Sequence, residues 1–269
     1  MIGYGNSMFL ATHGILARAA SGGGVDPDAQ AFITAAGITN PTQQGAINTL
    51  VVSLKGYGIW TKFKAIYPIV GGSSSSHAVN LKTPGTYNLT FATGWTHSST
   101  GMTPNGATYA NTGINVNSVM TLNSSSFGIY NRTDTAAGFK AHGVSVGSYF
   151  VLFDKWIGNM TYGYINDNGS TGVTASNTDA KGFYQVSRTA SNALRLVKNT
   201  THYTSSAASS SKPNDNFYLG ANHVGGGNFN YANDRQLAFG YLADGLSQTE
   251  CDNLYTAVQA YQTTLSRQV

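Results

Sequence analysis

Glutamate is almost absent from this chain of 269 residues, which contains only Glu250. Charged residues of all kinds make up 10% of the sequence, against roughly a quarter in an ordinary soluble domain. These shortages exclude a solvent-exposed helical bundle stabilised by Glu–Lys pairs, because the residues for such pairs are missing. They also exclude a glycosidase that uses a pair of glutamates.

Cysteine, basic runs and long apolar runs are scarce as well. The one cysteine, Cys251, has no partner for an internal disulfide. No run of about 18 apolar residues predicts a membrane span, and the first twenty residues lack the basic start of a secretory signal. The net charge is +4 without any cluster of Lys or Arg. We therefore expect neither a nucleic-acid partner nor a membrane partner.

Abundant Ser, Thr, Asn, Gly and Tyr take the place of charge. With 32 glycines, 16 tyrosines and alternating apolar and polar residues, the chain predicts a mainly β protein, an antiparallel sandwich or jelly roll. Asn168-Gly169 predicts a type I′ hairpin. The predicted strands are Trp60–Val70 (with Phe63, Ala65 and Tyr67 on one side), Ala78–Lys82, Phe127–Thr133, Gly147–Lys155, Met160–Asn166, Gly182–Thr189, Leu194–Lys198, Phe217–Ala221 and Gln236–Leu242.

Helices are predicted at both ends of this β region. Asp26-Pro27 and Asn40-Pro41 each combine a capping residue with a proline at the first helical position, so two short helices should lie within residues 26–58. Ser247 and Glu250 form a capping box that should begin a C-terminal helix over residues 247–269. Glu250 is therefore expected to be structural, and the sandwich should span residues 59–246.

Residues 1–25 form an apolar arm followed by a glycine-rich linker. Burying the apolar side chains of the arm would be favourable at about 0.8 kcal/mol per CH₂. The arm either docks onto a partner subunit or packs on its own domain, and we expect docking. The side chains expected to make that contact are Tyr4, Met8, Phe9, Leu10, Ile15 and Leu16.

Two loops have the composition of a carbohydrate site, in which aromatic faces and amides hold a sugar with few charges. The loop around Trp95 and His97 is one, and residues 222–231 form the other. The alternatives are a core role for the indole and a flexible connection for the second loop. The candidate sugar-binding residues are Trp95, His97, Asn222, His223, Asn228 and Tyr231.

Calcium is the only cofactor that the sequence suggests. Asp167, Asn168 and Asp234 are candidate ligands because hard cations bind carboxylate and amide oxygens, although a hairpin turn explains the first two equally well. Asp154 and Asp167 are the candidates for an aspartate-based glycosidase. The six histidines show no metal-ligand spacing, so we expect isolated loop or surface rings at His13, His77, His97, His142, His202 and His223.

The C-terminal part of the chain resembles the concanavalin A-like lectin/glucanase domains of the laminin-G-like kind. The resemblance rests on short motifs: Tyr218–Ala221, Gln236–Tyr241, Asp244–Ser247 and Leu254-Tyr255. Enzymatic members of this family carry a glutamate pair on one strand. This chain has no such pair, so the resemblance implies a sandwich without hydrolytic activity.

Over about residues 26–269 the chain also resembles structural proteins of tailed bacteriophages of Bacteroidetes. Residues 32–72, with Asn40-Pro41-Thr42 and Trp60–Phe63, and the stretch Gly94–His97 carry this resemblance. It implies a non-enzymatic virion component (capsid decoration, head fibre or tail-associated protein), assembled in the host cytoplasm and released by lysis. The implied partners are other virion proteins, contacted through residues 1–24, and sister subunits of a homo-oligomer such as a trimer.

Two other functions stay open at this point. One is a carbohydrate-binding module that adheres to host or mucosal glycans, which is compatible with a place on a virion. The other is an aspartate-based glycosidase or depolymerase, for which the sequence shows no defined carboxylate pair.

Overall fold

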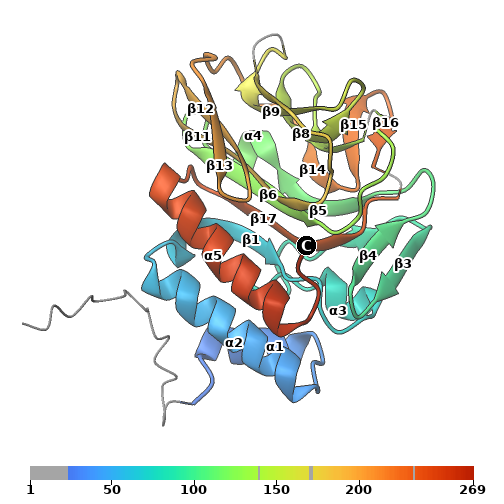
Figure 1. Cartoon of the computed structure of the whole chain (residues 1–269), viewed down its shortest axis with the longest axis vertical. Helices are drawn as coiled ribbons and strands as arrows, with labels where there is room; N and C mark the ends of the chain where they lie inside the picture. Colours follow the sequence, from blue (N-terminus) through green and yellow to red (C-terminus); the bar gives the residue numbers. More distant parts are fainter. Residues whose placement is uncertain (1–23, 139, 170–171, 233) are drawn as a thin grey trace, which may run out of the picture.

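The β-strands dominate the computed structural model, which describes residues 24–269 except residues 139, 170–171 and 233. In this part of the chain the strands form sheets of eight, six and three strands. The two larger sheets stack as a sandwich, and three helices cover the outer face of the eight-stranded sheet (Figure 1). The predicted mainly β, antiparallel sandwich is confirmed.

The eight-stranded sheet separates the helices from the second sheet. Its order is β13-β12-β11-β6-β17-β4-β3, with β1 also paired to β17. Its strands are β1 (Phe63–Tyr67), β3 (Trp95–Ser98), β4 (Gly101–Pro104), β6 (Ser125–Asn131), β11 (Gly182–Ala190), β12 (Ala193–Lys198), β13 (Thr201–Ser205) and β17 (Leu237–Ala243).

The six-stranded sheet has the order β10-β9-β8-β7-β15-β16, in which only β7 and β15 pair in parallel. It consists of β7 (Ala141–Val144), β8 (Tyr149–Trp156), β9 (Met160–Asp167), β10 (Val173–Ser176), β15 (Ala221–Gly225) and β16 (Asn228–Tyr231). The small sheet contains β2 (Thr90–Phe91), β5 (Ala110–Asn115) and β14 (Asn216–Leu219).

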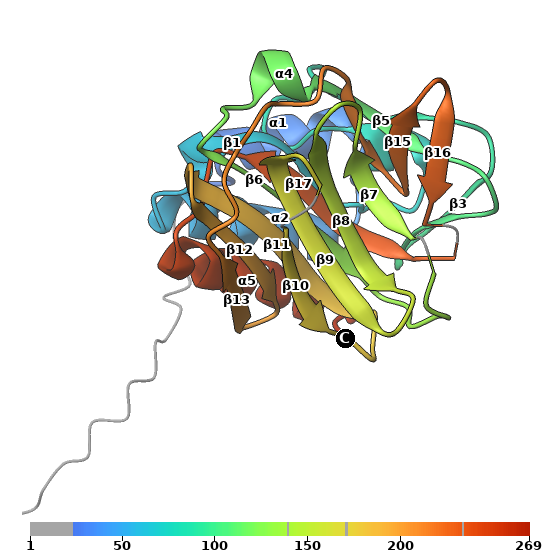
Figure 2. The ribbon, with the colours of Figure 1, turned by 90° about the horizontal axis from the view of Figure 1, so that it is seen from above.

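Five α-helices and one 3₁₀ helix complete the described part of the chain. They are α1 (Pro27–Ala35), α2 (Pro41–Gly56), the 3₁₀ helix η1 (Trp60–Lys62), α3 (Ser74–Ala78), α4 (Val116–Val119) and α5 (Gln248–Thr264). Seen from above, α2 and α5 lie on the far side of the sandwich from β8 and β9 (Figure 2). Within the described residues, no helix is both long and apolar enough to cross a membrane.

Alternation along the strands of the eight-stranded sheet builds two cores. On β11, Phe183 packs with the helices, whereas Tyr184 and Val186 pack between the two sheets. On β6, Tyr130 faces the helices, and Phe127 faces the second sheet. Because both faces of this sheet are covered, the outer face of the six-stranded sheet is the broad sheet surface left to solvent.

The predicted helix starts are confirmed. Asp26 accepts a hydrogen bond from the amide of Asp28, Asn40 accepts one from the amide of Gln43, and a proline follows each cap. At the start of α5, the Ser247 hydroxyl accepts from the Glu250 amide at 3.3 Å, and the Glu250 carboxylate accepts from the Ser247 amide at 2.8 Å. Glu250 also pairs with Lys62 at 2.6 Å, so this carboxylate is occupied by structural contacts.

Three local predictions are wrong. A bulge between Phe63 and Ala65 shifts the alternation of β1, so Phe63 packs with the helices while Ala65 and Tyr67 enter the sandwich core. The serine run before Ala78 forms the capped helix α3, and residues 79–82 form no strand. The connection at Asn168-Gly169 is longer than a two-residue type I′ hairpin, because β9 ends at Asp167 and β10 begins at Val173.

Candidate functional site

Aromatic side chains cover the solvent-facing side of β8 and β9. Neighbouring residues of these antiparallel strands are Phe153 with Tyr162 and Val151 with Tyr164, so alternate residues share the outer face. Phe153 is 6% exposed, and the other rings are half-buried. We call this surface the aromatic platform and define it by five residues: Tyr149, Phe153, Trp156, Tyr162 and Tyr164.

The rings of the platform lie in fixed relative orientations. Tyr162 and Tyr164 are nearly parallel, with an interplanar angle of 8° and ring centroids 6.4 Å apart. Trp156 stands almost perpendicular to Phe153, at 86° and 4.3 Å. Phe153 therefore forms a floor that is bounded by an upright indole on one side and by the two tyrosines on the other.

Gly172 explains how Tyr164 can lie low on the sheet. Gly172 precedes β10, where Val173 pairs with Gly163, so Gly172 is the neighbour of Tyr164 on the adjacent strand. A Cβ atom at Gly172 would meet carbons of the Tyr164 ring at 2.4 Å, which is closer than real side chains approach. The absent side chain leaves the space that the ring occupies, and the ring leans across the neighbouring strand.

Two hollows flank the paired tyrosines. Phe153, Trp156, Tyr162 and Tyr164 enclose a hollow of about 170 Å³. A groove of about 590 Å³ lies on the other side and is lined by Tyr162, Tyr164, Gly172, Thr174 and residues 205–208. No lining residue of either hollow is charged. The surface therefore offers ring faces and hydroxyl groups to a neutral ligand.

The hydroxyl of Tyr164 stays protonated under ordinary conditions. Burial, with a smaller contribution from the nearby Asp167, raises the pKa of Tyr164 to about 12. The group can therefore donate and accept a hydrogen bond at the edge of the groove. Thr174 and Ser206 are exposed on the same lining and add further hydroxyl groups.

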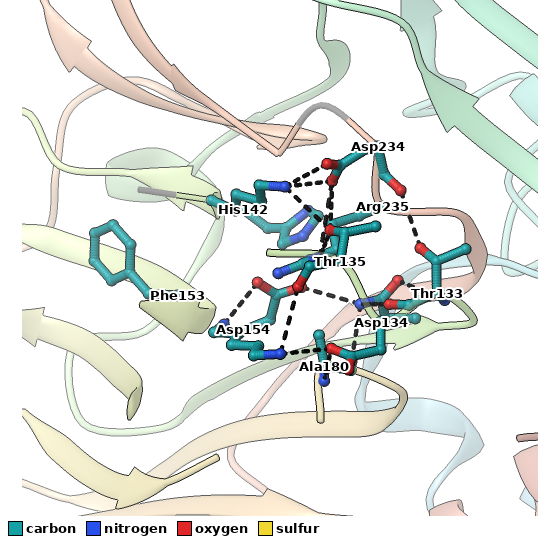
Figure 3. Close-up of polar contacts among 12 residues, drawn as sticks. Thr133, Asp134, Thr135, His142, Phe153, Asp154, Ala180, Asp234 and Arg235 are labelled. Atoms are coloured by element: carbon teal, nitrogen blue, oxygen red, sulfur yellow. Dashed lines mark hydrogen bonds and ion pairs between the residues drawn. The ribbon is translucent and has the colours of Figure 1, made fainter. Parts of the chain in front are cut away.

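The inner side of β8 anchors the platform through a buried ion pair. Arg235 donates from Nε to Asp154 at 2.8 Å, and both side chains are 0% exposed. Asn131 also donates to Asp154, and the nearby Lys155 pairs with Asp134 at 2.8 Å. Figure 3 shows Phe153 directed away from this polar cluster. The cluster supports β8 from within, and Asp154 does not reach the surface.

The proposed loop residues Trp95 and His97 lie on β3, beyond the aromatic platform. Trp95 donates from Nε1 to the carbonyl of Tyr109 at 3.1 Å, and its ring covers Gly220 closely enough that a Cβ there would lie 2.6 Å away. The expectation of isolated surface histidines is wrong for His97, because its Nδ1 lies 2.9 Å from Nδ1 of the buried His77. Both residues are largely occupied by packing.

Burial and hydrogen bonds keep the inner histidines neutral. The Gly72 amide donates to Nε2 of His77, so its proton lies on Nδ1 and points to His97. Burial lowers the pKa of His77 to about 3, with a smaller effect of His97. His142 is also buried rather than at the surface, and burial lowers its pKa to about 3. These rings are structural and uncharged.

Residues 222–231 form the hairpin of β15 and β16, and the structure separates their side chains. Asn222 is buried and donates to Ser145 at 2.9 Å, whereas Asn228 lies at the turn and donates to the carbonyl of Gly225 at 3.2 Å. His223 pairs with Asp215. The rings join what we call the stacked cluster, which consists of Tyr109, Tyr218, His223, Phe229 and Tyr231.

The candidate calcium ligands do not converge. Asp167 is opposite Tyr149 at the start of β8, whereas Asp234 adjoins Arg235, which pairs with Asp154 near the end of β8. Asp234 is occupied by Lys140 at 2.5 Å. Asn168 follows Asp167 at the end of β9. The described residues contain no group of three or more His, Cys, Asp or Glu side chains that could hold a metal ion.

The aspartates considered for catalysis are equally separated. Asp154 lies near the C-terminal end of β8, whereas Asp167, the last residue of β9, lies opposite Tyr149 at the start of β8. Both side chains are 0% exposed.

The arm side chains from Tyr4 to Leu16 lie outside the described residues.

The aromatic platform was missed in the sequence. Its signal is Tyr162-Gly163-Tyr164, which places two rings on one face of a strand, followed by a glycine at 172. The chain pairing that adds Phe153 and Trp156 is not visible in the linear sequence.

Comparison with known proteins identifies the fold but no family. No protein-family model matches the sequence, and no curated protein is similar to it. A mutant of Trypanosoma rangeli sialidase that displays trans-sialidase activity is similar with a TM-score of 0.47 and 10% identity, over 81% of this chain and 39% of that chain.

Two toxin domains are similar with slightly higher TM-scores. The botulinum neurotoxin serotype D binding domain has a TM-score of 0.51 and 10% identity, over 74% of this chain and 52% of that chain. The binding domain of botulinum neurotoxin DC, in complex with SialylT, has a TM-score of 0.50 and 10% identity, over 73% and 52%. The matches thus span about half the length of the toxin domains. At these identities the likeness shows a shared β-sandwich fold.

Proposed function

We propose that this protein binds carbohydrate chains through uncharged contacts on the aromatic platform. The observation that carries the proposal is the pair of parallel rings, Tyr162 and Tyr164, between two uncharged hollows on an open sheet face. The apolar face of a pyranose ring packs well on an exposed aromatic ring, and its hydroxyl groups need donors and acceptors at the rim. Tyr164, Thr174 and Ser206 supply such groups.

The comparisons support the architecture for this role. A binding domain with this sandwich fold is known in complex with SialylT. The platform on this chain supplies the local chemistry that the fold alone does not specify.

The test is binding of neutral linear hexaoses (β-glucan, mannan, chitin and galactan types) by calorimetry, with and without EDTA. We expect at least one to bind and Tyr164→Ala to weaken that binding about ten-fold, because it removes a stacking face worth roughly 1.4 kcal/mol. Tyr57→Ala is the matched control, since Tyr57 is 39% exposed at the end of α2, across the sandwich from the platform. Equal affinities of the wild type and Tyr164→Ala would refute the platform as the site.

We propose further that binding occurs without hydrolysis. Asp154 and Asp167 are buried, and Glu250 caps α5, so none of these three carboxylates lines the platform's open hollows. Incubation of the bound hexaose with the protein should release no reducing ends. Release by the wild type that persists after removal of trace contaminants would contradict this.

A place on a bacteriophage particle, through residues 1–24 and in a homo-oligomer, is a separate proposal. It is supported by the sequence resemblance and by the low charge of the chain. Mass spectrometry of purified particles should detect the chain, and deletion of residues 1–24 should reduce its incorporation. Absence from intact particles would exclude this role without affecting carbohydrate binding.

A further inference from the structure

A second groove adjoins the platform at the edge of the sandwich. It has a volume of about 310 Å³ and lies between the β11–β13 strands and the start of α5. Ser205 and Ser206, at the end of β13, line both this groove and the groove of about 590 Å³ beside Tyr162 and Tyr164. The two depressions therefore share one wall, and a ligand longer than a single ring can extend from one into the other.

The second groove differs from the platform in carrying a cation. Arg195 lines it from β12, with Ser187 and Thr204 as its neighbours across the sheet. These three residues lie on the helix side of the sheet, because the next residue, Leu196, packs between the sheets. Arg195 thus adds a positive charge to a lining that is otherwise polar or apolar but uncharged.

Neighbouring groups hold the guanidinium in place without neutralising it. Its Nη1 donates to Gln248 at 3.1 Å and lies 3.3 Å from Nδ1 of His202. Nε2 of His202 lies 2.7 Å from Asp252. Because Nδ1 faces a donor, His202 accepts there and donates from Nε2 to the carboxylate. Among the described residues Arg195 forms no ion pair of its own, and both of these contacts use Nη1.

We propose that the carbohydrate ligand is an oligosaccharide that crosses Ser205 and Ser206 and presents an anionic substituent, a carboxylate or a sulfate ester, to Arg195. This inference rests on the proposed function of the platform and specifies its ligand class. Nε and Nη2 of Arg195 form no hydrogen bond with the described residues, so they present two parallel donors to an oxyanion, and such charge-assisted hydrogen bonds are about twice as strong as neutral ones. The neutral platform supplies stacking, and Arg195 supplies selection for acidic chains.

The test uses the neutral hexaose that binds best and matched derivatives of it. Each derivative carries one carboxylate or one sulfate at C6 of a terminal ring, prepared at either end of the oligomer. We expect at least one acidic derivative to bind about ten-fold more tightly than the neutral parent. In Arg195→Gln the acidic-to-neutral affinity ratio should fall to about one, and Arg195→Lys should restore part of it.

The control and the outcomes separate the two proposals. Lys181→Gln removes an exposed cation outside both grooves and should leave the ratio unchanged. A gain with carboxylate alone, or with sulfate alone, supports the proposal and identifies the anion. A ratio near one in the wild type, or a gain that persists in Arg195→Gln, overturns the Arg195 inference and leaves the platform intact. Failure of every hexaose to bind overturns both.

Discussion

The aromatic platform and the stacked cluster contain the same kinds of side chain but differ in what their rings contact. In the stacked cluster Tyr109 and Phe229 lie face to face, with centroids 4.7 Å apart at 14°, and Tyr231 continues the stack. In the platform the two parallel tyrosines are 6.4 Å apart, and hollows lie on both sides of them. In the stacked cluster the ring faces pack against one another, whereas in the platform they face hollows that a ligand can fill.

The difference follows from the local backbone. The stacked cluster is assembled where β5, β14, β15 and β16 come together, so rings from several segments meet over a short distance. The platform is built on two long paired strands, where side chains on one face repeat at the spacing of alternate residues. Because Gly172 has no side chain, the Tyr164 ring can lie across the neighbouring strand. Aromatic content alone therefore does not identify a binding surface.

The largest expected effect comes from the ion pair that connects the two regions. Asp154 lies on β8 beneath the platform, and Arg235 follows β16 of the hairpin that carries Phe229 and Tyr231. Asp154→Ala leaves the buried guanidinium with only the solvent-exposed Asp234, 3.8 Å away, as a counter-charge, so we expect the free energy of unfolding to fall by about 3–5 kcal/mol in urea denaturation. The double variant Asp154→Ala/Arg235→Met should recover part of this loss. A loss below about 1 kcal/mol would show that the pair does not hold the regions together.

Phe229→Ala should separate stability from binding. The ring packs on Tyr109, Tyr231 and His223, and its removal should lower the free energy of unfolding by about 2 kcal/mol. Glycan affinity should stay within two-fold of the wild type, which is the reverse of the expected behaviour of Tyr164→Ala. Calorimetry measures the glycan affinity of both variants, and thermal melting measures their stability. A ten-fold affinity loss in Phe229→Ala would remove the distinction between the two surfaces.

Patterns that depend on neighbouring residues in the sequence were predictable, and those that depend on strand pairing were not. The proline-led helices and the Ser247–Glu250 cap involve residues a few positions apart. The bulge at Phe63 arises from pairing with β17, nearly 180 residues away along the chain. The residues next to Phe63 in the sequence do not predict it.

The candidate site shows the same limit. The composition of the glycine-rich segment 222–231, which combines amides and aromatics, predicts a sugar site, yet the hairpin buries Asn222 and stacks Tyr231 on Phe229. Tyr162 and Tyr164 resemble ordinary strand residues until β8 and residues 205–208 are placed beside them. The spatial neighbours, which the sequence does not display, decide whether a ring is occupied or available.

A smaller effect is expected from adding a single methyl group at Gly172. Gly172→Ala should displace the Tyr164 ring, because the new Cβ would lie 2.4 Å from it. The backbone there does not have the left-handed conformation that favours glycine, but the new Cβ would also lie 2.7 Å from the carbonyl oxygen of Gly163, so the backbone must shift as well. We expect glycan affinity to fall about three-fold, with a fall in melting temperature smaller than that of Asp154→Ala. Gly147→Ala is a poor control because of its positive φ of 75°, whereas Gly45→Ala within α2, with open space around its Cβ position, is a suitable one.

The smallest effect distinguishes the two surfaces by pH. Burial raises the pKa of Tyr164 in the platform and of Tyr218 in the stacked cluster to about 12, from an ordinary value of 10. The folded state holds each proton more tightly than the unfolded state does, so the associated stability is present below pH 10 and is lost as the pH rises through 12. Tyr164→Phe and Tyr218→Phe should each reduce this alkaline loss in urea denaturation. Of these two hydroxyls only that of Tyr164 lies beside the uncharged groove, which Tyr162 also lines, so the fall of glycan affinity in alkali should be smaller in Tyr164→Phe than in the wild type and in Tyr218→Phe. A parallel fall in all three proteins would mean that the folding equilibrium, rather than the platform hydroxyl, governs binding at high pH.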